Sequence, residues 1–76
     1  MNYYRVQVQL GHLGSARAQF EEWHIATSSS ATDVMFNTGK LLPGINRVLE
    51  VHAVTEQEWR TMRELGRQAF TVEPRR

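Results

Sequence analysis

Histidine and glutamate are the side chains in this sequence that offer metal-ligand or acid–base chemistry. The three histidines, His12, His24 and His52, come from one predicted loop and two different predicted strands, without the short spacing of metal ligands. Glu21 and Glu22 are adjacent on a predicted strand, so their carboxylates point to opposite faces and cannot work as a pair. The sequence therefore predicts no metal site, no cofactor and no catalytic residue, and we expect that the protein is not an enzyme.

Two short motifs resemble reactive or phosphate-binding loops only superficially. The serines of segment 28–30 are not set in the strand–turn–helix context of a nucleophile elbow. The glycines of segment 11–14 lack the spacing of a phosphate-binding loop. We interpret these segments as a strand-to-helix connection and a hairpin turn.

A row of arginines is the strongest binding motif in the sequence. On a predicted helix, Arg60, Arg63 and Arg67 fall within about 60° of one another, beside an aromatic residue. Such a row can hold phosphates or an acidic partner surface. Glu56 and Glu64 stand at helical spacing from these arginines, which instead indicates ordinary exposed ion pairs along the helix. With the two arginines of the C-terminal end, the candidate anion or nucleic-acid contacts are Arg60, Arg63, Arg67, Arg75 and Arg76.

Composition limits the class of protein. The 76 residues include nine Lys and Arg against eight Asp and Glu, a formal net charge of +1, which argues against a non-specific polyanion binder. The absence of cysteine excludes disulfides and thiolate chemistry and fits a reducing compartment. No basic-then-apolar leader and no long apolar stretch is present, so we expect a cytoplasmic protein without a membrane span.

The N-terminal third predicts two strands joined by a hairpin loop. Polar and apolar residues alternate over 3–10, which indicates a half-buried strand. Residues 17–27 predict a second strand, in which Phe20 and Trp23 fall on opposite faces. Either a bulge near Glu21–Glu22 turns Trp23 inward, or Trp23 lies on the outer face.

A helix and a third strand follow. Ser30 and Asp33 form an acidic variant of the capping box, and apolar residues recur at helical spacing as far as Leu42. Pro43–Gly44 ends this helix. Residues 45–54 predict a strand with apolar residues on both faces.

The second helix has the clearest boundaries at its start. Thr55 and Glu58 form a capping box, and the apolar face extends to about Gln68. The predicted fold is therefore an α+β two-layer sandwich of order ββαβα, with a three-stranded, mainly antiparallel sheet in the order 2-1-3 and both helices on one face. An order with the third strand beside the second is the alternative. We expect a single domain over 1–70 and a flexible C-terminal tail over 71–76.

An open sheet face opposite the helices is the predicted place of function, because exposed aromatic residues there often mark an interface. We expect a small non-enzymatic interaction module of the adaptor or inhibitor type, a character common among phage and mobile-element proteins. It would bind a protein partner, or itself as a homodimer, through the sheet face or an edge. The alternative is a nucleic-acid-binding module that uses the arginines named above. The predicted partner-binding residues of the sheet face are Tyr3, Arg5, Trp23 and Val48.

Overall fold

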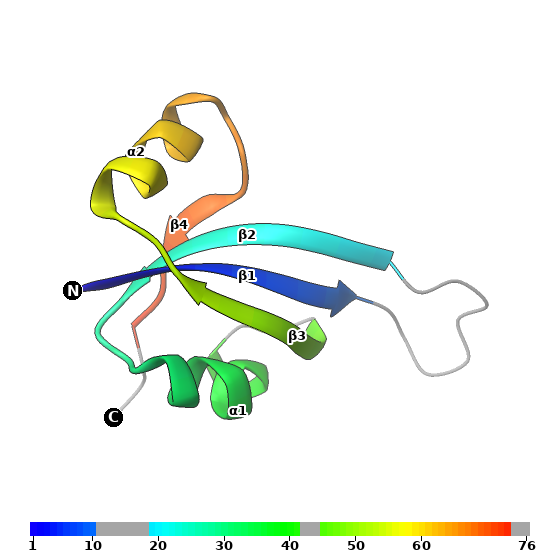
Figure 1. The fold of residues 1–76 in the computed structure, drawn as a ribbon. Helices are drawn as coiled ribbons and strands as arrows, with labels where there is room; N and C mark the ends of the chain where they lie inside the picture. The colour runs from blue at the N-terminus through cyan, green and yellow to red at the C-terminus, as the bar shows by residue number, and fades with distance from the viewer. Residues whose placement is uncertain (11–18, 42–44, 74–76) are drawn as a thin grey trace.

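The computed structural model describes residues 1–10, 19–41 and 45–73. Within these residues the strands form one sheet in the order β3-β1-β2-β4 (Figure 1). β1 runs antiparallel to β2 and β3, and β4 runs parallel to β2. The predicted α+β class and the 2-1-3 order of the first three strands are confirmed, and the order with the third strand beside the second is wrong. The elements are β1 (Asn2–Leu10), β2 (Gln19–Thr27), α1 (Ala31–Leu41), β3 (Ile45–Ala53), α2 (Glu56–Glu64) and β4 (Ala69–Thr71).

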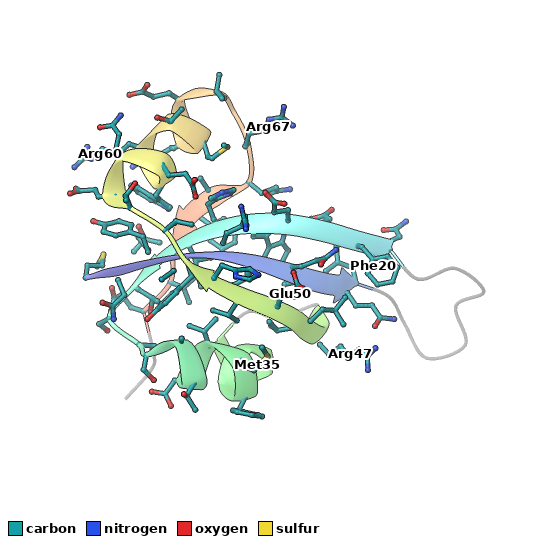
Figure 2. The ribbon with its side chains drawn as sticks, viewed as in Figure 1. Phe20, Met35, Arg47, Glu50, Arg60 and Arg67 are labelled. Carbon is teal, nitrogen blue, oxygen red and sulfur yellow. The ribbon has the colours of Figure 1, made fainter. Side chains whose placement is uncertain are left out.

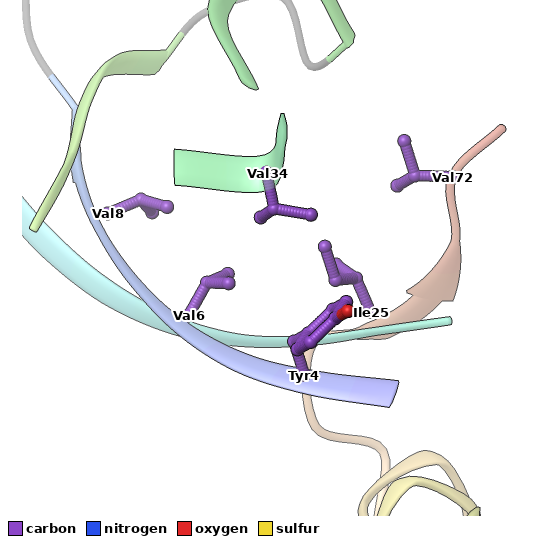
Figure 3. Packing of buried hydrophobic residues seen from close by; sticks show 6 residues of the cluster. All are labelled: Tyr4, Val6, Val8, Ile25, Val34 and Val72. Atoms are coloured by element: carbon purple, nitrogen blue, oxygen red, sulfur yellow. The ribbon is translucent and has the colours of Figure 1, made fainter. Parts of the chain in front are cut away.

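The core is built on one face of β1. Tyr4, Val6 and Val8 point inward and are buried, as the alternation in the sequence predicts, and Leu10 at the end of the strand is half-buried. Side chains of β2, α1 and the segment after β4 pack on them, so that one apolar layer joins four parts of the chain (Figure 3). We call this side of the sheet the core face and the opposite side, where Tyr3, Arg5 and Gln7 point, the polar face. The buried cluster consists of Tyr4, Val6, Val8, Ile25, Val34 and Val72.

The two helices cover opposite faces of the sheet (Figure 1). Val34 of α1 packs in the buried cluster on the core face. Trp59 of α2 instead stacks on Tyr3, with ring centroids 5.6 Å apart, on the polar face. The predicted arrangement with both helices on one face is therefore wrong, because the single buried residue of α2 meets the side chain of an odd-numbered position of β1.

Both alternatives predicted for β2 are wrong, because the strand has no bulge and Trp23 does not lie on the outer face. β1 and β2 pair without interruption from Asn2↔Thr27 to Leu10↔Gln19. Trp23 lies opposite Val6 and therefore shares the core face with it. Phe20 takes the polar face, where 56% of its surface is exposed. β2 therefore alternates regularly without an extra residue, and the consequence is that the Phe20 side chain stays exposed on the polar face.

An irregularity does occur in β3. Gln7 pairs with Glu50, but Val8 pairs with Val48, so Leu49 is the extra residue of a bulge. This shift brings Val48 onto the core face together with Val51, although simple alternation would separate them. A second register shift follows between Gln9 and Leu10 of β1.

Both helix starts follow the predicted capping. The N–H of Asp33 donates to Ser30 Oγ at 3.2 Å, and the N–H of Glu58 donates to Thr55 Oγ1 at 3.1 Å. The helix α2 is shorter than predicted and ends at Glu64 instead of about Gln68. Gly66 follows with φ of 74°, in the left-handed region that terminates helices.

The last strand was not predicted, because Ala69 and Phe70 fit the helical spacing of α2. They instead form β4, which pairs in parallel with His24–Ala26 of β2. Thr71 belongs to this strand and Val72 is only 6% exposed, so the fold includes the start of the segment predicted as a tail. The division of the chain into a domain and a tail stays a prediction. The hairpin turn at 11–14, the Pro43–Gly44 helix stop and residues 74–76 lie outside the described residues.

The substitution Val72→Ala tests whether the segment after β4 belongs to the core. We expect it to lower the free energy of unfolding by about 2 kcal/mol, from lost apolar burial and the cavity left behind. Thr71→Ala at the neighbouring exposed position is the control and should change stability by about 0.5 kcal/mol or less. Urea denaturation of both variants measures the difference, and equal small effects would contradict the packing of Val72.

Candidate functional site

The four predicted sheet-face residues do not form one surface. Tyr3 and Arg5 lie on the polar face, and Tyr3 packs on Trp59. Trp23 and Val48 pack against the buried cluster on the core face. Val48 was predicted on the open face because the sequence does not locate the bulge in β3, and Trp23 because alternation within β2 does not decide which of its faces is buried. As a group they therefore cannot form a single exposed patch on the sheet.

Two of the predicted arginine contacts are engaged within α2. Arg60 forms an ion pair with Glu56 at 2.8 Å. The hydrogen bond from Arg60, together with its charge, lowers the pKa of the Glu56 carboxyl below its ordinary value. The guanidinium of Arg63 lies 5.4 Å from the centroid of the Trp59 ring, within cation–π range.

The third arginine of the predicted row is not on the helix. Arg67 follows Gly66, after α2 has ended, and lies in the connection to β4. Figure 2 shows Arg60 and Arg67 on opposite sides of α2. The continuous stripe expected from helical spacing is therefore interrupted. Arg75 and Arg76 lie outside the described residues.

The histidines do not converge. His24 of β2 and His52 of β3 are both in register with Arg5, which stands between them on the central strand. His12 lies outside the described residues. Among residues 1–10, 19–41 and 45–73, no three potential ligands are grouped to hold a metal ion.

The edge of β2 is only partly used. β4 pairs with His24–Ala26, and the N–H of His24 donates to the carbonyl of Gln68 at 2.7 Å. Because the backbone groups of successive strand residues point to opposite edges, those of Phe20 and Glu22 point to the same edge as those of His24. Within the described residues no strand lies there. We call the segment Gln19–Trp23 the free edge of β2.

A pocket of about 800 Å³ lies beside this free edge. Two glutamates of β2 form one side, and the end of α2 with its connection to β4 forms the other. Leu65 is 64% exposed and offers apolar surface at the pocket. The lining residues are Glu21, Glu22, His24, Met62, Leu65, Gly66, Arg67 and Gln68.

His24 is the buried residue of this lining, with 2% of its surface exposed. Neither ring nitrogen has a hydrogen-bond partner. Glu58 Oε2 on α2 is also buried without a partner and lies 3.9 Å from His24 Nε2. Buried polar groups are normally hydrogen-bonded, so this pair is exceptional within the fold.

Neither a protein family, nor a curated protein, nor a solved structure matches this chain. No helix in the described residues is long and apolar enough to cross a membrane. In the part of the chain that the structure describes, a small α+β fold presents a regular strand with half of its outer edge unpaired beside a pocket.

The free edge of β2 was not predicted, because β4 was not predicted. The signal that was available is Gly66, a helix-terminating residue inside the predicted helix, followed by the β-favouring pair Thr71–Val72. Together they indicate that α2 ends early and that an extended segment follows. Which part of β2 that segment covers depends on pairing across the sheet, which no local pattern contains.

The pair His24→Leu and Ile25→Ala tests the unusual burial of His24. Because the imidazole makes no hydrogen bond, we expect His24→Leu to change the free energy of unfolding by about 1 kcal/mol or less. Ile25 is buried on the opposite face, and its truncation should cost about 2–5 kcal/mol. Urea denaturation measures both. A loss for His24→Leu as large as that for Ile25→Ala would show that the imidazole has a stabilising partner.

Proposed function

We propose that this chain is a small protein-interaction module that binds an extended polypeptide segment by strand addition at the free edge of β2. The observation that carries the proposal is the incomplete pairing of β2. On the side away from β1, its Gln19–Trp23 half has no neighbour among the described residues, although the same edge pairs with β4 at His24–Ala26. Main-chain hydrogen bonds to Phe20 and Glu22 would supply affinity in this mode of binding.

The edge of β2 is a better template than the edge of β3. β2 pairs with β1 in an unbroken register along its whole length. β3 carries two register shifts, and such irregularities twist an edge and discourage further pairing. A segment added to Gln19–Trp23 would lie in line with β4, which already pairs with the next residues of the same edge.

The pocket supports selective binding. An added strand points alternate side chains to the polar face, where α2 lies. Met62 and Leu65 offer apolar surface to such a side chain, and Glu22 offers a charge. A pocket of this kind beside an edge strand is how strand-adding domains distinguish one segment from another.

The nucleic-acid alternative has less support. Arg60 is engaged by Glu56, and Arg63 lies over the ring of Trp59. Arg67 lies on the opposite side of α2 from Arg60, so phosphate groups would meet separated cations rather than a row.

A random peptide library displayed on phage, selected against the whole chain, tests the proposal. Enriched peptides should bind the native protein, and the Glu22→Ala variant measures what loss of the Glu22 carboxylate alone costs in affinity. They should lose at least about tenfold in affinity with Glu22→Pro, because proline removes the outward N–H of residue 22. Since that N–H does not pair with β1, the fold should tolerate the substitution.

Circular dichroism and a thermal melt of Glu22→Pro provide the control for folding. If Glu22→Pro is unfolded, Phe20→Pro tests the same edge. Phe20→Ala is then the matched control, because it removes the same side chain but keeps the N–H. Enriched peptides that bind the folded proline variants as tightly as the native protein would contradict the proposal. A selection that enriches no peptide would contradict it as well.

A further inference from the structure

From the charges at the free edge of β2, we infer that its partner is a basic segment, with a Lys or Arg opposite Glu22, and not a second copy of this chain. This inference rests on the proposed strand addition. It adds the chemistry of the partner, which the unpaired backbone groups alone do not specify.

The free edge carries negative charge only. Within Gln19–Trp23 there are two glutamates and no cation. Glu22 is exposed on the polar face, while Glu21 is half-buried and its Oε2 accepts a hydrogen bond from Trp23 Nε1 at 2.7 Å. Cross-strand neighbours of opposite charge stabilise a pairing, and like charges weaken it. The edge is therefore complementary to a basic strand.

A second copy fits this edge poorly. Antiparallel pairing of the whole Gln19–Trp23 segment with itself is centred on Glu21, so it places the two Glu21 side chains directly opposite each other. Such neighbours have Cβ atoms only about 5 Å apart, where two carboxylates repel. Charged residues on an edge are a common protection against self-association, and here the same charges select the partner.

The pocket fits a long basic side chain. The residue opposite Glu22 on an added strand points to the polar face, toward α2. Its aliphatic stem can lie on Met62 and the exposed Leu65, with its charged end at Glu22. Behind the pocket, Glu58 lies 3.9 Å from His24 and adds a further carboxylate.

Arg67 is the opposing charge in the same lining. It repels a cation in the pocket and so weakens the selection without abolishing it, since Glu22 lines the same pocket and Glu58 lies behind it. Its removal should therefore strengthen binding of a basic segment. No such gain is expected for an acidic segment.

Three short synthetic peptides test the inference, and they differ only in the residue at every second position. The first is Thr-Lys-Val-Lys-Thr-Lys-Val-Lys-Thr, and the others carry Gln or Glu at the lysine positions. Titration into the ¹⁵N-labelled whole chain measures each Kd, and the amides of Phe20 and Glu22 report the site. We expect the Lys peptide to bind about tenfold tighter than the Glu peptide at low salt, with a smaller difference at high salt.

Two variants sharpen the test. Glu22→Lys should reverse the order of the Lys and Glu peptides, and Arg67→Ala should tighten the Lys peptide alone. Equal binding of all three peptides, with shifts at Phe20 and Glu22, would overturn the charge selection but leave strand addition standing. Binding without shifts at these amides, or no binding, would overturn both. Light scattering that shows a dimer, with Phe20 and Glu22 at its interface, would overturn the exclusion of a second copy.

Discussion

Burial of the even-numbered side of β1 beneath α1 is the constraint on which the rest of the molecule depends. Val6 and Val8 are fully buried there, and neighbouring strands must supply side chains that point the same way. Because alternation sends every other residue of β1 to the opposite side, that side is polar and cannot support a second core of equal size. Trp59 is the single buried residue of α2, and the helix meets the polar face at Tyr3 and, through Glu58, near His24. In the described part of the chain, Gln7, Phe20 and Glu22 remain exposed on that face.

Trp59 also determines how the C-terminal part of the chain joins the sheet. Its ring stacks on Tyr3 of β1, and its Nε1–H donates to the carbonyl of Phe70 in β4 at 3.4 Å. The turn at Gly66 then directs the chain back to the sheet, and it reaches β2 only at His24. The connection before β4 stands away from the sheet and leaves the pocket beside the free edge. The proposed binding site is thus a consequence of where α2 is anchored.

The parts of the fold that depend on local chemistry could be predicted from the sequence. The alternation in β1 and the caps at Ser30 and Thr55 need only neighbouring residues, and the structure confirms them. The face occupied by Trp23 depends on whether Phe20 can remain exposed, which alternation within β2 does not decide. The bulge at Leu49 and the position of α2 depend on pairing and packing between distant segments. For the candidate site, edge binding was one of the modes predicted from the sequence and stays a proposal, while the residues predicted for the sheet face are separated by the fold.

Amide hydrogen exchange along β2 tests the central claim, an edge that is half open, most directly. Outward N–H groups without a partner should exchange at nearly the rate of an unstructured chain, and paired ones should be protected. We predict fast exchange at Phe20 and Glu22, and slow exchange at Glu21 and Trp23, which face β1, and at His24, which donates to Gln68. Strong protection of Phe20 and Glu22 in the isolated chain at low concentration would contradict the account, because that edge would then already be paired.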